Sequence, residues 1–326
     1  MKARPGLFAG MAAVVVAALL AGAAPAPAQS LQNQVLALYP RATGELVFVD
    51  LRGMRGTPHY ARIKQQVLPD RFRTLEQWVA ALGVDFDREI RQLSWAFTSD
   101  AAGIGFVGVA EGDFTLSEVE SQARRLKLTV AKPGGTLLVT LGKNEQGADF
   151  VFSFLDRSTA LFGSRGAVQE ILDRRSQGGQ SLLDNGPFAG LITPLNGRGP
   201  VWIVLDRKFS GLSFRQMLPD ASQAPGFDQV ADRVNSTTLR FELKSGLQSQ
   251  AVVQCRDAQD ALVLSTAAQA AFAFQSVQLQ QSNPELARAL SQIRVSRNDT
   301  RLDLNWSIPE SDFTTLLAKN GLALKF

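Results

Sequence analysis

An internal repetition of one pattern of strands and helices constrains the fold of this chain more than any other feature. Residues 46–51 and 201–205 are short apolar strands, each ending beside an Asp and an Arg. After each strand, a polar helical segment, two strands, a helix, two more strands and a last helix follow in the same order. This order predicts an α+β fold of two tandem modules. Each module is expected to be a mostly antiparallel sheet with helices packed on one face.

Side-chain periodicity gives the expected bounds of these elements. Apolar residues at i, i+3, i+4 and i+7 mark a helix face at 75–82, and Thr74 with Gln77 is expected to cap its start. Thr115 and Glu118 form a second capping box. The expected strands are 92–98, 103–110, 136–141 and 149–155, then 237–244, 248–255, 293–297 and 301–308. The remaining expected helices are 115–126, 165–174, 258–281 and 310–319.

Composition indicates where the two modules meet. The stretch 177–199 is rich in Gly, Asn and Pro, which is typical of loops. We place the module boundary inside it, next to Asn196. The expected organisation is a signal peptide at 1–28, a first α+β module at 29–196 and a second at 197–326.

The N-terminus has the three parts of a cleavable signal peptide. Lys2 and Arg4 give a basic start, 7–24 is an apolar run, and small residues precede a cleavage site between Ala28 and Gln29. The alternative is an uncleaved membrane anchor, because the run approaches the length that spans a bilayer. No other stretch is expected to span one. We therefore predict a periplasmic or secreted protein without a transmembrane segment after signal cleavage.

Several short motifs are shared with exported bacterial proteins. They are the tyrosine-proline pair at 39–40, the strand at 46–51, Leu82-Gly-Val-Asp85, Leu161-Phe-Gly-Ser-Arg-Gly166 and Ser181-Leu-Leu-Asp-Asn185 with Phe188. With the signal peptide, these features make the chain resemble an uncharacterised family of exported bacterial proteins built from two tandem α/β modules, a domain of unknown function. The resemblance implies the fold and the location, and it implies no activity.

The sequence lacks the residue patterns typical of catalysis and metal binding. The single histidine, His59, has no partner at metal-ligand spacing. The single cysteine, Cys255, ends an alternating stretch, which favours a buried thiol and excludes an intrachain disulfide. The run from Gly103 to Gly108 matches G-x-G-x-x-G, but it is strand-like, so we interpret it as close packing between strands. Asp85 is interpreted as a helix cap. We therefore expect no catalytic residue, no cofactor and no metal.

Charge and aromatic content narrow the choice of partners. The formal net charge is +4, and no Lys/Arg run exceeds two residues, which argues against nucleic acid as a partner. The chain has 20 Phe and only 2 Tyr. Some Phe residues share a strand face or a helix and are candidates for an apolar ligand face, with an ordinary core as the alternative. These residues are Phe150, Phe152 and Phe154 on one strand, and Phe272 and Phe274 in the long helix.

Three functions remain open at this point. The first is an exported, non-enzymatic cell-envelope protein with a binding or structural role, whose partner is an unknown envelope protein or a hydrophobic ligand. It is favoured because the catalytic patterns are missing from the sequence. The second is a periplasmic carrier of lipid or another hydrophobic ligand, which rests on the Phe residues. The third is an enzyme without a recognisable motif, built from carboxylates, Ser, Lys or Arg alone.

Overall fold

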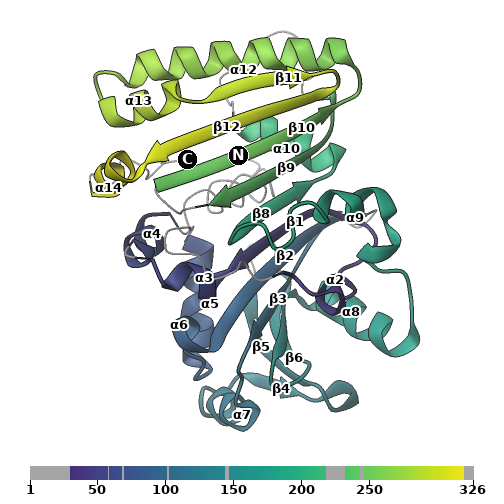
Figure 1. Cartoon of the computed structure of the whole chain (residues 1–326). Coiled ribbons are helices and arrows are strands. Elements are labelled where there is room, and N and C mark those ends of the chain that lie inside the picture. Colours follow the sequence, from purple (N-terminus) through teal and green to yellow (C-terminus); the bar gives the residue numbers. More distant parts are fainter. Residues whose placement is uncertain are drawn as a thin grey trace, which may run out of the picture. The chain divides into compact units, whose positions relative to one another are not determined.

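The structure is a computed structural model that describes residues 30–57, 59–67, 70–100, 103–143, 147–217, 232–242 and 246–318. The expected signal peptide, with Ala28 and Gln29, lies outside the described residues. Helices and antiparallel strands make up a mixed α+β fold, as the sequence predicted (Figure 1).

The chain forms two compact units. Unit 1 contains Gln29–Arg52 and Pro69–Pro194, and unit 2 contains Gly53–Leu68 and Leu195–Phe326. The division at Pro194 lies close to the expected boundary after Asn196. The segment Gly53–Leu68 also belongs to unit 2. The sequence analysis placed one boundary next to Asn196 and therefore assigned these residues to the first module. Polar helical segments of this kind carry little information about the neighbour on which they pack.

Unit 1 contains a sheet in which every neighbouring pair is antiparallel. Its strands are β1 (Thr43–Asp50), β2 (Ile90–Asp100), β3 (Gly103–Gly112), β4 (Thr129–Ala131), β5 (Leu137–Lys143), β6 (Asp149–Phe154) and β7 (Thr159–Ser164). They follow the order β1-β2-β3-β7-β6-β5-β4. The hairpin predicted from 136–141 and 149–155 is confirmed as β5 and β6.

The sheet of unit 1 is buried on both faces. All eight residues of β1 are buried, and the continuous apolar run at 46–49 is typical of a strand covered on both sides. On β6, Phe152 and Phe154 are buried on one face, while Val151 and Ser153 are buried on the other. This differs from the expected arrangement, in which helices cover one face only.

Neither of the capping boxes predicted for the helices of unit 1 forms in the structure. They are α2 (Asn33–Leu36), α5 (Asp70–Ala81), α6 (Phe86–Glu89), α7 (Leu116–Arg125), α8 (Arg165–Gln177) and α9 (Gly186–Ile192), with the 3-10 turns η1 (Pro133–Gly135) and η2 (Leu182–Asp184). The division between the units falls within α3 (Leu51–Arg55).

The predicted capping residues Thr74 and Thr115 do not cap a helix through their side chains. Thr74 lies inside α5, because no helix breaker precedes it after Asp70. Thr115 is the N-cap residue of α7, as predicted, but its side chain makes no capping hydrogen bond.

Unit 2 also consists of antiparallel strand pairs. Its strands are β8 (Val201–Leu205), β9 (Val234–Glu242), β10 (Gly246–Cys255), β11 (Arg294–Asn298) and β12 (Arg301–Pro309), in the order β8-β9-β10-β12-β11. Its helices are α4 (Tyr60–Val67), α10 (Arg207–Met217), α12 (Ala258–Leu279), α13 (Pro284–Ser291) and α14 (Glu310–Ala318). The helix predicted at 258–281 is confirmed as α12, whereas α13 was not predicted. Asn283 caps α13 by accepting a hydrogen bond from the Leu286 N–H, and Pro284 occupies its first turn.

The two faces of the unit 2 sheet differ in chemistry. On one face, Val234, Val253 and Leu302 pack against Ala261 and Leu264 of α12. Side chains point alternately to opposite faces of a strand, so the intervening residues of β9, β10 and β12 lie on the other face, and most of them are polar. In unit 2, this polar face agrees with the prediction that helices pack on only one face of the sheet.

Five strands follow the same order in both units. The order β1-β2-β3-β7-β6 in unit 1 matches β8-β9-β10-β12-β11 in unit 2, and β5 and β4 extend the first sheet. The counterpart of the β11–β12 hairpin is therefore β6–β7 and not the predicted β5–β6, because β7 is the strand that pairs with β3. The sequence prediction missed β7, since it treated 161–166 as the lead into a helix.

Candidate functional site

The outward side of α12 is the most unusual surface among the described residues. The helix has 22 residues, and only its first turns contribute buried side chains to the core. Further along, Phe274 is 63% exposed, Val277 is 64% exposed and Leu262 is 43% exposed. We define the α12 outer face by residues at helical spacing that point away from the sheet. It consists of Gln259, Leu262, Thr266, Ala270, Ala273, Phe274 and Val277. Figure 1 shows α12 along the edge of the unit 2 sheet.

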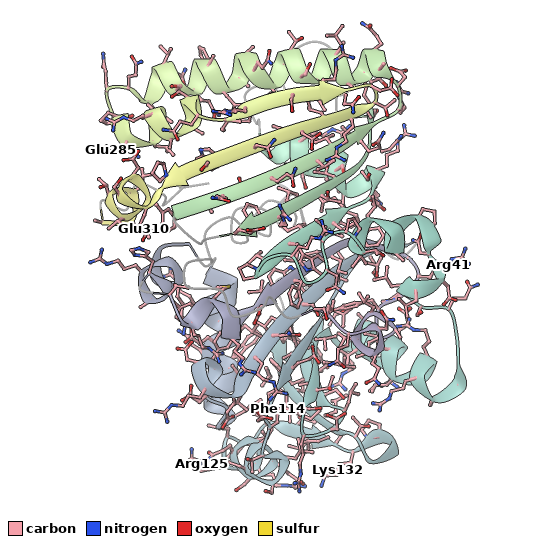
Figure 2. The ribbon with its side chains drawn as sticks, in the orientation of Figure 1. Arg41, Phe114, Arg125, Lys132, Glu285 and Glu310 are labelled. Atoms are coloured by element: carbon pink, nitrogen blue, oxygen red, sulfur yellow. The ribbon has the colours of Figure 1, made fainter. Side chains whose placement is uncertain are left out.

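The α12 outer face carries no charge. No charged residue occurs between Asp260 and Glu285, which is labelled in Figure 2. By length and composition α12 is apolar enough to cross a membrane, because its most apolar stretch of 18 residues has a mean hydropathy of 1.2. Only 11% of that stretch is buried. This corrects the expectation that no stretch after residue 28 has that length and composition. Gln, Ser and Thr interrupt the apolar residues, but the lack of charge keeps the mean hydropathy high.

Two arginines lie beside this helix on the same side of the sheet. Arg297 is directly opposite Leu302 in the β11–β12 register, so both point to the face that α12 covers. Arg288 belongs to α13, which packs against α12. Both arginines are exposed, and neither forms a salt bridge within the described parts of the chain. Arg288 and Arg297 therefore place two positive charges near α12, together with the carboxylate of Glu285 in the first turn of α13.

A buried carboxylate fixes the start of α12. Asp260 is 2% exposed and accepts hydrogen bonds from Arg233 Nη1 at 2.6 Å and from Arg256 Nε at 2.9 Å. Burial alone would raise the pKa of Asp260, but the hydrogen bonds and charges of the two guanidinium groups outweigh it and lower that pKa below its usual value. Asp257 is the N-cap residue and accepts from the Asp260 N–H. The first turn of α12 is thus held to the ends of β9 and β10.

Cys255 is a structural residue, as the sequence predicted. It is buried, and its side chain belongs to the core between α12 and the sheet. Burial, together with the nearby carboxylates of Asp260 and Asp257, raises the pKa of the Cys255 thiol to about 11. The thiolate is the reactive form, so this cysteine is inert at neutral pH.

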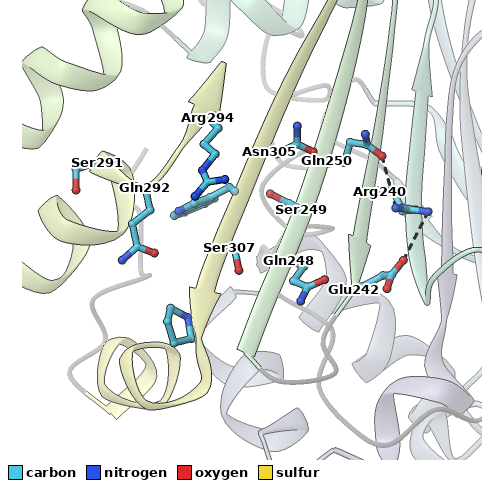
Figure 3. Close-up of a pocket in the computed structure, with 12 residues that line it drawn as sticks. Arg240, Glu242, Gln248, Ser249, Gln250, Ser291, Gln292, Arg294, Asn305 and Ser307 are labelled. Carbon is cyan, nitrogen blue, oxygen red and sulfur yellow. Dashed lines mark hydrogen bonds and ion pairs between the residues drawn. The ribbon is translucent and has the colours of Figure 1, made fainter. Parts of the chain in front are cut away.

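A polar hollow lies on the opposite face of the unit 2 sheet. Its volume is about 790 Å³ (Figure 3). Strand register places Arg240, Gln250, Asn305 and Arg294 in one row across β9, β10, β12 and β11. A second row contains Glu242, Gln248 and Ser307. Trp306 and Pro309 also line the hollow, as do Ser291 and Gln292 after α13.

Sequence reasoning did not find the polar hollow. The alternation of polar and apolar residues along each strand was visible, and it indicated a solvated face. The rows depend on which residues of β9, β10, β11 and β12 stand opposite each other. Register between strands that are distant in sequence is decided by tertiary packing.

The five phenylalanines proposed as an apolar ligand face do not form one surface. Phe150, Phe152 and Phe154 belong to unit 1, where Phe150 contacts Trp78 at 4.9 Å and Phe152 stacks on Phe162 at 5.7 Å. These rings fill the core of unit 1, which agrees with the alternative interpretation. In unit 2, Phe272 is half-buried on α12. Phe274 lies on the α12 outer face.

The other singled-out residues have structural roles. His59 Nε2 lies 2.6 Å from Glu310 Oε1, and the His59 ring contacts the Phe313 ring edge-on, with the ring centroids 5.8 Å apart. His59 therefore links the segment Gly53–Leu68 to α14. Asp85 caps α6 by accepting from two backbone N–H groups. The glycine run lies within β3, and a Cβ atom on Gly108 would come 2.1 Å from Phe162 Cζ. In the part of the chain that the structure describes, no cluster of His, Cys, Asp and Glu could hold a metal ion.

Two solved structures have a similar fold. No family model matches the chain, and no curated protein matches it. Crystal form I of TP0453, a Treponema protein, is similar with a TM-score of 0.51 and 11% sequence identity, over 90% of this chain and 98% of that chain. Crystal form III of TP0453 gives a TM-score of 0.50 and 12% identity, over 89% and 99%. At this level of identity, the likeness shows the fold alone.

Proposed function

We propose that this protein is an exported, non-enzymatic protein of the cell envelope that binds a membrane surface through the α12 outer face. Export to the periplasm or the exterior rests on the signal-peptide pattern of residues 1–28. The absence of enzymatic activity rests on the missing catalytic patterns in the sequence. The binding role rests on α12.

The observation that carries the proposal is a helix without charge after Asp260 in its first turn, which is covered on one side only. A helix that is apolar around its whole circumference is normally buried in a protein core or in lipid. Here Ala261 and Leu264 face the core, while Phe274 and Val277 are exposed. Large apolar side chains that are exposed together, as Phe274 and Val277 are, mark an interaction site. The α12 outer face therefore needs an apolar partner.

The charge around α12 favours lipid as that partner. Helices that lie on membranes combine an apolar face with Lys or Arg near the headgroups, and anionic lipids attract those cations. Arg288 and Arg297 lie beside the α12 outer face without salt-bridge partners among the described residues. Because Ala261 and Leu264 hold the helix on the sheet, a position along the surface is favoured over a span of the bilayer.

The carrier of a hydrophobic ligand is less well supported. Phe152 and Phe154 pack among other aromatic rings in the core of unit 1. The hollow formed by the described residues of unit 2 is lined mainly by polar side chains.

The proposal includes the tandem origin of the two units. The shared order of five strands, which alternates with helices at the same places in both units, supports two copies of one module. β4 and β5 would then be an extension of the first copy. The membrane-binding helix α12 has its counterpart in α7, which has only 10 residues.

Vesicle flotation tests the proposal. The mature chain, starting at Gln29, is expected to float with phosphatidylglycerol vesicles. Replacing Phe274 and Val277 together with Ser should weaken this binding at least about tenfold, because burying a large apolar side chain contributes ~1.5–3 kcal/mol and 1.4 kcal/mol is a factor of ten.

Two further pairs of variants complete the flotation experiment. Leu126→Ser with Leu183→Ser removes apolar residues of unit 1 that are 44% and 40% exposed, and this control should bind as the wild type does. Arg288→Gln with Arg297→Gln should reduce the preference for phosphatidylglycerol over phosphatidylcholine, since each cation near the surface contributes about 1 kcal/mol. Unchanged binding by the Phe274 and Val277 variant would refute the proposal.

A further inference from the structure

We infer that the polar hollow of unit 2 is a binding site for an oligosaccharide that carries a carboxylate. The hollow has a volume of about 790 Å³, which is in the usual range of small-ligand sites. It lies on the sheet face opposite to α12. The inference therefore goes beyond the proposed membrane attachment and does not depend on it.

The row of amides matches the chemistry of sugar hydroxyl groups. Gln250 and Asn305 stand directly opposite each other on β10 and β12, and Gln248 lies one row further along. A side-chain amide both donates and accepts hydrogen bonds, as does each hydroxyl group of a sugar. Neighbouring strands are about 4.8 Å apart, so a row across four strands spans about 14 Å. Such a row offers evenly spaced partners to a chain of linked sugar rings.

The charges in the hollow select for an anionic ligand. Arg240 Nη1 is 3.6 Å from Glu242 Oε1, so these two charges compensate each other. Arg294, at the other end of the row, is exposed and forms no salt bridge within the described residues. A guanidinium group in this position can hold a carboxylate with two parallel hydrogen bonds. One acidic sugar next to Arg294 would balance the charge of the hollow. Figure 3 shows Arg294 and Arg240 at opposite ends of the row.

Trp306 and Pro309 close the hollow at its rim. β11 pairs with β12 over Arg301 to Asn305, so Trp306 lies just beyond the paired stretch. Trp306 alternates with Asn305 and Ser307 along β12, so its side chain points to the α12 side of the sheet. Its Nε1–H donates to the Ala289 carbonyl at 2.7 Å, which fixes the orientation of the ring at this edge of the hollow.

Two other ligand classes fit less well. A peptide usually adds to the edge of a sheet through its backbone, whereas these polar groups lie on the face of the sheet. A nucleic acid needs a concentrated basic stripe, whereas the hollow has one uncompensated arginine.

Calorimetric titration with the tetrasaccharide of galacturonic acid tests the inference. The mature chain should bind it in a saturable manner. The methyl ester of the same tetrasaccharide, which lacks the negative charges, should bind at least about tenfold more weakly, because hydrogen bonds to charged groups contribute ~1.5–3 kcal/mol. Arg294→Gln should weaken binding of the acid by a similar factor, and Gln250→Ala with Asn305→Ala should weaken binding of both forms.

Arg297→Gln is the matched control, because Arg297 lies on the same strand but points to the α12 face. It should leave sugar binding unchanged. The inference would be overturned if the acid did not bind, if Arg294→Gln and Arg297→Gln weakened it equally, or if tetraglutamate bound as well as the sugar. Vesicle flotation of Arg294→Gln separates the two proposals, since membrane binding does not use the polar hollow.

Discussion

Replacing Asp260 with Asn is expected to destabilise unit 2 by about 1.5–3 kcal/mol, the usual contribution of hydrogen bonds to a charged group, because a buried carboxylate would lose its charge between two partly exposed arginines. Asp260 is the shared acceptor of Arg233 and Arg256. Asparagine has the same shape but no charge, so two guanidinium groups would face each other at the start of α12. Hydrogen exchange in peptides from α12 and β9, together with urea unfolding, measures the loss.

The effect of Asp260 depends on pH in a defined direction. The pKa of Asp260 is lowered in the folded state. Its contribution is therefore complete above the unfolded pKa of about 3.9 and is lost as the pH falls through the folded value. The difference between wild type and Asp260→Asn should be constant from pH 7 to about 5 and shrink below about 3.9.

Asp303→Asn is the control for this prediction. Asp303 also pairs with an arginine, Arg301, but its carboxylate is more exposed than that of Asp260, and surface pairs contribute about 0–1 kcal/mol. A loss of similar size in both variants would show that the buried network does not hold α12. A constant difference down to pH 2 would show that ionisation of Asp260 is not the cause.

Replacing Gly108 with Ala is expected to lower the free energy of unfolding of unit 1 by about 1–3 kcal/mol, the usual cost of overpacking a filled core. A Cβ atom at this position would lie 2.1 Å from Phe162 Cζ. The Phe162 ring is held between Phe106 and Phe152, with centroids at 6.0 and 5.7 Å. The ring cannot move aside without disturbing these neighbours. Urea unfolding followed by tryptophan fluorescence measures the loss.

Gly166→Ala is the matched control for Gly108→Ala. Gly166 lies in the first turn of α8, and a Cβ atom there would meet nothing within 4 Å. Alanine favours the helical conformation over glycine, so this variant should be as stable as the wild type or slightly more stable. Equal stability of Gly108→Ala and the wild type would contradict the close packing of Phe162 over β3.

The sequence predicted elements whose signal is local. Alternation of polar and apolar residues identified β9, β10 and β12, helical spacing identified α5 and α7, and the repeated order of elements identified β2, β3 and α12. Two elements were missed although local signals were present. Asn283 and Pro284 are a typical helix start for α13. The apolar residues before Gly163 form β7. Gly163 itself has a φ of 149° and lies in close contact with β3.

The candidate sites depend on information that is not local. Apolar and small polar residues are mixed on all sides of α12, so its periodicity could not show which side the sheet covers. The five phenylalanines were grouped by residue type, but packing divides them between a filled core and an exposed helix. The row that joins Arg240 to Arg294 requires a register between strands that are far apart in the sequence.

Spin labelling of α12 tests the central claim most directly. The buried thiol of Cys255 does not react at neutral pH, so a label can be attached at Phe274→Cys in otherwise unchanged protein. With phosphatidylglycerol vesicles, this label should become accessible to oxygen and protected from a water-soluble nickel complex. A label at Leu126→Cys in unit 1 should stay in water. If both labels stayed accessible to the nickel complex with and without vesicles, the α12 outer face would not be a membrane-binding surface.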